Sequence, residues 1–235
     1  MNQNSRVISG KETPALLLAG GRPRDPAAMA RMMAGAFEGI RKPQAAYIGT
    51  ANGDDTDFFR MMEPLLTQAG AEKVVFVRLA KKKPDLDAAK NILAGSDVIF
   101  LAGGEVEEGM NWLKKHGLGD FLKNLYGAGK RFMGVSAGTI MMGTQWVRWE
   151  DPEDDGTARL FDCLGIIPAL FDVHGEEDDW AELKAALKLT GNGALGYALP
   201  RGCMISADSR GALVNLTGEY LVFVNEAGGI KQITN

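Results

Sequence analysis

The segment KRFMGVSAGTIMMG, residues 130–143, passes from a short apolar run to a helical pattern around one serine. Apolar and small residues lead into Ser136, and an apolar run with helical spacing follows it. Gly134 and Gly138 stand two residues before and two residues after the serine. The segment therefore predicts a strand, a sharp turn at Ser136 and a helix.

The same order of apolar strand, turn and amphipathic helix extends through most of the chain. The intervening helical segments begin with Asp or Glu and end with Gly at or just beyond the last residue. Near-continuous apolar strands that alternate with helices are typical of a parallel sheet covered on both faces. We therefore predict a three-layer α/β/α fold with a mainly parallel central sheet. The predicted strands are 15–20, 45–50, 73–79, 97–103 and 131–138, and the predicted helices are 25–40, 55–70, 85–95 and 105–129.

The pattern changes at about residue 194, where short apolar runs are separated by Gly, Asp and Asn. These runs predict antiparallel strands added to one edge of the sheet. Because no linker, low-complexity tract or internal repeat interrupts the chain, we predict a single domain over 1–235. Residues 1–13 are polar and are predicted to form a flexible or peripheral N-terminal segment.

The composition indicates a globular protein without a strongly charged partner. The formal net charge is −4, which gives no reason to expect nucleic acid or an anionic membrane as a partner. The N-terminus lacks a hydrophobic signal core and no apolar stretch approaches twenty residues, so we expect a cytoplasmic protein. The two cysteines, Cys163 and Cys203, show no metal-binding spacing and are predicted to be buried free thiols. We predict no metal or organic cofactor.

Ser136 has two interpretations. Gly134-Val-Ser136-Ala-Gly138 matches G-x-S-x-G between a predicted strand and a predicted helix, which is the context of a nucleophile elbow. The amide of Ala137 would then face a developing oxyanion, with a second donor from the Gly-Gly strand end at 103–104. In the alternative, Ser136 is a helix N-cap and the glycines only permit close packing. The pattern alone leaves these two about equally weighted.

Only two histidines are available as a general base. His116 precedes Gly117 and is typical of a residue at a helix C-terminus. His174 follows an apolar segment and can face the same edge of the sheet as Ser136. A structural histidine bonded to Asp172 is the other interpretation of His174. The acids that could orient the imidazole are Glu150, Asp151, Asp172 and the cluster Glu176 to Asp179, and the residues alone do not choose among them.

The order of these motifs resembles the peptidase E (aspartyl dipeptidase) and cyanophycinase family of serine peptidases, which have a class I glutamine amidotransferase-like fold. The resemblance covers most of the chain. It rests on LLLAGG (16–21), on the strand, Thr-Ala and helix pattern of AAYIGTANGDDTDFF (45–59), on DVIFLAGGEVEEG (97–109), on the G-x-S-A-G segment and on DVHGEEDDW (172–180).

The resemblance implies a role for each residue of the site. It makes Ser136 the nucleophile and His174 the general base, with oxyanion N–H groups from Ala137 and from Gly103 or Gly104. Asp151 is the nearest match to the third triad residue of the dipeptidase branch, with Glu150 beside it. The cyanophycinase branch instead has an acid near the C-terminus, and none stands between Gly196 and Gly202 here.

Two departures from the family pattern concern the substrate. Glu105-Val106 follow the Gly-Gly loop where the family usually has Asn-Thr or Asp-Gln, and Glu105 is a candidate substrate-binding residue. Acids at 176–179 replace the arginines that follow the family histidine in the cyanophycinase branch, which favours a cationic group over an N-terminal Asp.

The sequence therefore predicts a serine hydrolase that cleaves a small peptide or amide, and we allow for a homodimer. A pseudoenzyme or ligand-binding module on the same fold is the main alternative. A glutaminase-type amidotransferase is disfavoured, because its nucleophile would be a cysteine and position 136 holds serine.

Overall fold

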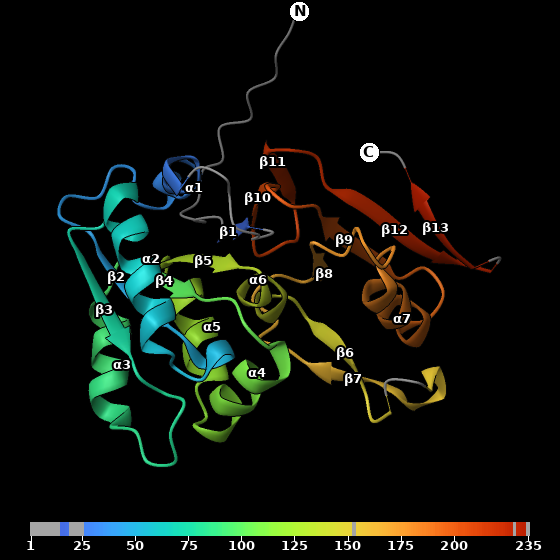
Figure 1. Cartoon of the computed structure of the whole chain (residues 1–235), viewed down its shortest axis with the longest axis horizontal. Coiled ribbons are helices and arrows are strands. Elements are labelled where there is room, and N and C mark those ends of the chain that lie inside the picture. Colours follow the sequence, from blue (N-terminus) through green and yellow to red (C-terminus); the bar gives the residue numbers. More distant parts are fainter. Residues whose placement is uncertain (1–14, 19–25, 152–153, 228, 234–235) are drawn as a thin grey trace, which may run out of the picture.

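We describe the fold from a computed structural model of the chain, which defines residues 15–18, 26–151, 154–227 and 229–233 (Figure 1). The N-terminal segment predicted at 1–13 and the first Gly-Gly turn, at 20–21, lie outside these residues. All five strands predicted in the first 140 residues are present. The strands predicted at 45–50, 73–79 and 97–103 end two residues earlier than predicted, and the one predicted at 131–138 ends three residues earlier.

The central sheet of the described residues has seven strands (Figure 1). Its five predicted strands run parallel to one another, and β10 and β11 add antiparallel pairings beside β1. The carboxyl ends of β4 and β5 therefore lie next to each other, which brings the loops after them to one edge. In spatial order the strands are β11 (Leu213–Thr217), β10 (Met204–Ala207), β1 (Ala15–Leu18), β5 (Arg131–Val135), β4 (Val98–Leu101), β2 (Gln44–Ile48) and β3 (Lys73–Val77).

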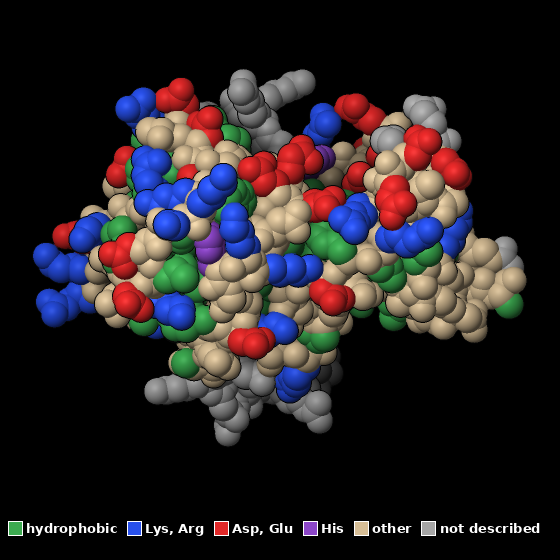
Figure 2. Space-filling model, turned by 90° about the horizontal axis from the view of Figure 1, so that it is seen from below, with side chains coloured by type: hydrophobic (Ala, Val, Ile, Leu, Met, Phe, Trp, Pro, Cys, Tyr) green, Lys and Arg blue, Asp and Glu red, His purple; other side chains and the backbone are tan. Residues whose placement is uncertain are grey.

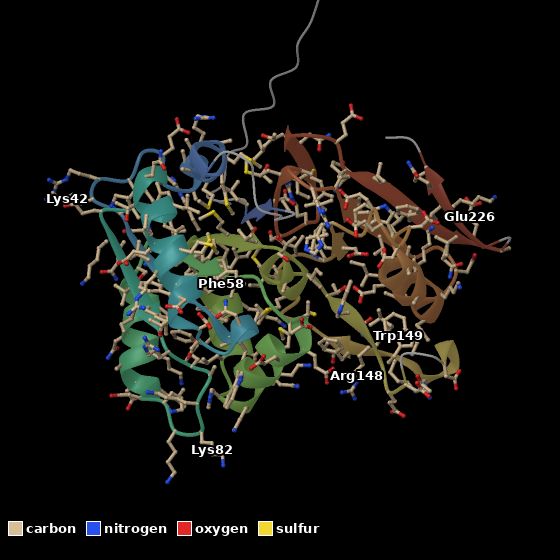
Figure 3. All side chains as sticks on the ribbon, viewed as in Figure 1. Lys42, Phe58, Lys82, Arg148, Trp149 and Glu226 are labelled. Carbon is tan, nitrogen blue, oxygen red and sulfur yellow. The ribbon has the colours of Figure 1, made fainter. Side chains whose placement is uncertain are left out.

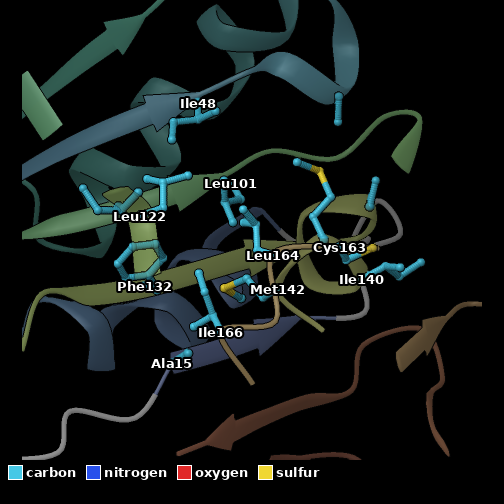
Figure 4. Close-up of a cluster of buried hydrophobic side chains, with 14 of the residues drawn as sticks. Ala15, Ile48, Leu101, Leu122, Phe132, Ile140, Met142, Cys163, Leu164 and Ile166 are labelled. Atoms are coloured by element: carbon cyan, nitrogen blue, oxygen red, sulfur yellow. The ribbon is translucent and has the colours of Figure 1, made fainter. Parts of the chain in front are cut away.

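Helices cover both faces of this sheet. Because successive side chains of a strand point to opposite faces, each strand contributes residues to the core on both sides. Ile99 and Leu101 of β4 pack in one core cluster, whereas Val98 and Phe100 pack in the other. Figure 4 shows the cluster that contains Leu101. Helices α3 (Leu86–Gly95), α4 (Val106–Lys115), α5 (Gly119–Gly127) and α6 (Ala137–Met142) contribute to this cluster, and α1 (Pro26–Met33) and α2 (Thr56–Ala69) to the other. The three-layer prediction is confirmed.

A second sheet and a hairpin stand beside the central sheet (Figure 1). The second sheet has the order β13 (Gly229–Ile233), β12 (Leu221–Glu226), β9 (Leu195–Leu199), β8 (Leu170–Val173), and α7 (Ala181–Thr190) packs on it through Leu183 and Leu187. The hairpin consists of β6 (Gln145–Trp149) and β7 (Ala158–Asp162). Short 3-10 turns occur at Ala34–Ala36, Thr50–Asn52 and Asp155–Thr157.

Two details differ from the sequence prediction. The strands after residue 194 divide between two sheets instead of joining one edge, because β9 pairs with β8 and only β10 and β11 extend the central sheet. The helix predicted at 105–129 is two helices. His116 caps the end of α4 and Gly117 adopts a φ of 63°, a left-handed conformation that glycine accepts without strain and that ends the helix there.

Candidate active site

Ser136 occupies a strained turn between β5 and α6. Its φ and ψ are 54° and −122°, a region that costs a non-glycine residue about 1–3 kcal/mol. Positions 134 and 138 must be glycine, because neighbouring backbone atoms leave no room for a Cβ. A Cβ at Gly134 would lie 2.6 Å from the Gly138 carbonyl oxygen, and one at Gly138 would lie 2.1 Å from the carbonyl oxygen of Leu101. This geometry matches the sharp strand-to-helix turn predicted from the sequence.

The hydroxyl of Ser136 contacts His174 instead of capping the helix. Ser136 precedes α6 at the N-cap position, yet its side chain makes no capping hydrogen bond. Its Oγ lies 2.9 Å from His174 Nε2. The backbone N–H of His174, the residue after β8, donates to the Leu199 carbonyl at 2.9 Å, which ties it to the end of β9. The two residues predicted to face each other from different strand ends therefore do so.

Within the part of the chain that the structure describes, two backbone amides near Ser136 have no acceptor. Among the hydrogen bonds of the described residues, none uses the N–H of Gly104 or that of Ala137. A Cβ at Gly103 would lie 3.6 Å from Ser136 Oγ, so the Gly-Gly loop packs directly against the serine. Free amides beside a nucleophile and at a helix N-terminus are suited to stabilise an oxyanion.

A cavity of about 510 Å³ opens beside Ser136 and His174. The β6–β7 hairpin forms an aromatic wall through Trp146, Trp149 and Phe161. Figure 3 shows Trp149 on this hairpin, with Arg148 next to it. A concave site of this size, with a small number of polar groups, accommodates a small molecule or a short peptide.

Acidic groups line part of the same cavity. Asp172 lies on β8 two residues before His174 and is only 3 % exposed. Burial, followed by the nearby Glu182 carboxylate, raises the pKa of Asp172 to about 7. Burial also raises the pKa of Glu182, with smaller contributions from Asp178 and Glu105. In Figure 2, acidic side chains gather where this face of the molecule is hollowed.

The remaining candidates make contacts of their own. Asp151 lies beyond β6, where its backbone N–H and C=O both bond to the Thr157 hydroxyl, and neither Asp151 nor Glu150 lines the cavity. Within the described residues, His174 makes no hydrogen bond to a carboxylate. His116 is the C-cap residue of α4, at the helix end as expected, and its Nε2 lies 2.9 Å from the Leu79 carbonyl oxygen.

The cysteine prediction is confirmed. Cys163 and Cys203 are both buried free thiols. Burial raises the pKa of Cys163 to about 12 and that of Cys203 to about 11. Thiols that stay protonated are poor nucleophiles, so neither cysteine competes with Ser136.

Sequence reasoning missed several residues of the cavity. The hairpin wall was not predicted, although alternation of apolar and polar residues in QWVRW (145–149) is a strand signal. Glu182 gave no signal, because an acid in the first turn of a helix is common for reasons of the helix dipole. Asn52 was also missed; its side chain bonds to the Gly103 carbonyl at 3.0 Å.

None of the described helices has the length and apolar character that crossing a membrane requires. In the described part of the chain, no group of three or more His, Cys, Asp or Glu side chains is arranged to hold a metal ion.

The chain matches one protein-family model and several solved structures. The family model of Peptidase family S51 matches residues 15–214. A peptidase from an acI-B1 actinobacterium superposes with a TM-score of 0.71 and 16 % identity, covering 94 % of this chain and 93 % of the other. A putative peptidase E protein from Listeria monocytogenes EGD-e gives a TM-score of 0.64 and 15 % identity, covering 88 % and 99 %. At these identities the two structures establish the shared fold. No curated protein matches the chain.

Proposed function

The chain belongs to peptidase family S51 and is thus a serine peptidase; from that premise we propose that Ser136 is its nucleophile and His174 its general base, acting on a small peptide or amide. The observation that carries this proposal is the 2.9 Å distance between Ser136 Oγ and His174 Nε2, on a strained turn at the edge of a cavity.

The reaction follows from this arrangement. His174 Nε2 takes the hydroxyl proton as Ser136 Oγ attacks the carbonyl carbon. The N–H groups of Ala137 and Gly104 hold the resulting oxyanion. The imidazolium then gives its proton to the leaving amine as the C–N bond breaks and an acyl-enzyme forms. Water, deprotonated by His174, attacks the ester carbonyl and releases the acid, which regenerates Ser136.

The third member of the triad stays a prediction at Asp151, on the family resemblance. Orientation of His174 also has local support. The backbone of His174 is fixed by Leu199, and its φ of 47° is a left-handed value that the surrounding contacts must hold in place.

A fluorophosphonate probe tests the proposal directly, because it modifies only an activated serine. We expect the wild type to be labelled once, at Ser136, and Ser136→Ala not to be labelled. Ser209→Ala, which alters a serine in an exposed turn, is the matched control and should label like the wild type. His174→Ala should slow labelling by at least about a hundredfold. A wild type that folds but is not labelled would favour the alternative, a ligand-binding module on the same fold.

A further inference from the structure

The cavity beside Ser136 contains carboxyl groups that no cation of the described chain neutralises. Asp172, Glu182 and Glu105 line it, and none of them forms a salt bridge. Among the described residues that line the cavity, Arg148 is the one Lys or Arg, and its Nη1 pairs with Glu107 Oε1 at 2.6 Å. The Ser136–His174 pair marks this cavity as a ligand site independently of these acids.

Asp172 is the most constrained of the three. At 3 % exposure its carboxyl group has lost most of its hydration, and the hydrogen bond that Oδ1 accepts from the Val173 N–H at 2.6 Å is local. An ionised carboxylate in such a position is costly unless a positive charge lies close to it. The raised pKa reflects this cost. A cation that enters the cavity would offset the cost of keeping Asp172 ionised.

The aromatic wall of the same cavity favours the same class of ligand. Trp146, Trp149 and Phe161 line the cavity, and Lys114 Nζ already lies 5.4 Å from the centroid of the Phe161 ring. Cations are attracted to the face of an aromatic ring, most strongly to that of Trp and where water is excluded. Carboxylates and indole rings around one cavity thus select an ammonium or guanidinium group over a carboxylate.

We propose that the substrate carries a cationic group close to the scissile bond, and that Asp172 and Glu182 bind it, with Glu105 at the rim. The position of the scissile bond rests on the proposed function of Ser136. The cation is either the N-terminal ammonium of the peptide or a Lys or Arg side chain.

Binding to Ser136→Ala tests this proposal without turnover. The probes are the amidated dipeptides Lys-Ala and Asp-Ala and their N-acetyl forms, measured by isothermal titration calorimetry. We expect Lys-Ala amide to bind at least about tenfold more tightly than acetyl-Asp-Ala amide, and this difference to shrink in 0.5 M salt. Retained binding of acetyl-Lys-Ala amide identifies the side chain as the cation, and its loss identifies the N-terminus. Equal or tighter binding of acetyl-Asp-Ala amide overturns the proposal.

Isosteric variants in the Ser136→Ala background locate the effect. Glu182→Gln and Asp172→Asn should each reduce the preference for Lys-Ala amide by about fivefold or more. Asp179→Asn is the matched control, because Asp179 is an acid of the same region that pairs with Lys184 and does not line the cavity. If both Glu182→Gln and Asp172→Asn keep the full preference for Lys-Ala amide, Asp172 and Glu182 do not bind the cation. Fluorophosphonate labelling is measured separately, on the protein with Ser136 intact. If that protein is not labelled but Ser136→Ala still prefers Lys-Ala amide, the proposed function is refuted and the cation-binding proposal stands.

Discussion

The side-chain amide of Asn52 donates a hydrogen bond to the Gly103 carbonyl at 3.0 Å and lies 3.3 Å from the Tyr47 hydroxyl. In a trans peptide unit the C=O and N–H point in opposite directions. A donor that fixes the Gly103 carbonyl therefore also fixes the direction of the Gly104 N–H. On the other side of Gly104, the Glu105 N–H donates to the Ala51 carbonyl at 2.6 Å. The loop that carries the proposed oxyanion donor is held from both sides.

Loss of this hydrogen bond should slow the chemical step. We expect Asn52→Ala to lower kcat by about tenfold with little change in KM, because an oxyanion donor acts on the transition state; direct loss of such a donor costs about 10²–10³ in kcat. The measurement is steady-state hydrolysis of the best amide substrate together with the rate of fluorophosphonate labelling.

Tyr47→Phe separates positioning from stability. This variant removes the phenol that contacts Asn52 and keeps the bond to Gly103. We expect it to lower the free energy of unfolding by about 1 kcal/mol and to change kcat less than threefold. If Tyr47→Phe and Asn52→Ala reduce kcat equally, Asn52 does not act through the Gly103 carbonyl.

The turn at Ser136 should not tolerate a methyl group at position 138. A Cβ there would meet the Leu101 backbone at 2.1 Å, which no side-chain movement relieves. We expect Gly138→Ala to lower the free energy of unfolding by about 3 kcal/mol or more, or to prevent folding. Gly127→Ala, at the open end of α5, has no atom within 4 Å of the added Cβ and should be neutral or slightly stabilising. Urea denaturation of the two variants compares these effects.

The assignment of Asp151 makes a separate prediction. If it completes the triad, Asp151→Asn should lower kcat by about a hundredfold or more, while Glu150→Gln beside it changes kcat less than threefold. Stopped assays across pH 5–9 would show whether the loss persists at high pH, as expected when the carboxylate stabilises the imidazolium. An unchanged kcat in Asp151→Asn removes Asp151 from the site. Asp172, two residues before His174, is then the acid to test through kcat.

The sequence was sufficient for the parts of the site that local rules determine. Strands ending in Gly-Gly or Gly-x-Ser predicted which loops meet, because parallel strands place their carboxyl ends at one edge. The proximity of Ser136 and His174 was predicted from residue type and strand position. The hairpin wall and Glu182 were not, since they reach the cavity through pairing of β6 with β7 and packing of α7, which are long-range contacts. The break at Gly117 was missed because the apolar spacing continues across it.

Stability should depend on pH through Asp172. Its pKa rises from an ordinary 3.8 to about 7 in the folded protein, through burial first and Glu182 second. Between these values the folded state binds more protons than the unfolded state, so the free energy of unfolding falls as pH rises, by at most about 1.4 kcal/mol per pH unit. The loss continues as pH rises through the folded pKa of about 7 and levels off about one pH unit above it. The charged groups that act on the pKa of Asp172 are Glu182 on α7 and Asp178 before α7. Glu105 at the start of α4, Arg148 on β6 and His174 beyond β8 line the same cavity.

Asp172→Asn isolates this contribution, because an amide does not titrate. Urea denaturation at pH 5 and pH 8 should show that the wild type loses stability over this interval relative to Asp172→Asn, whereas Asp179→Asn follows the wild type. Glu182→Gln should reduce the wild-type loss, since it removes the second cause of the raised pKa. A saturating cationic dipeptide should also reduce it, by stabilising the ionised carboxylate at pH 8. Parallel stability curves for the wild type and Asp172→Asn would show that Asp172 is ionised throughout this range.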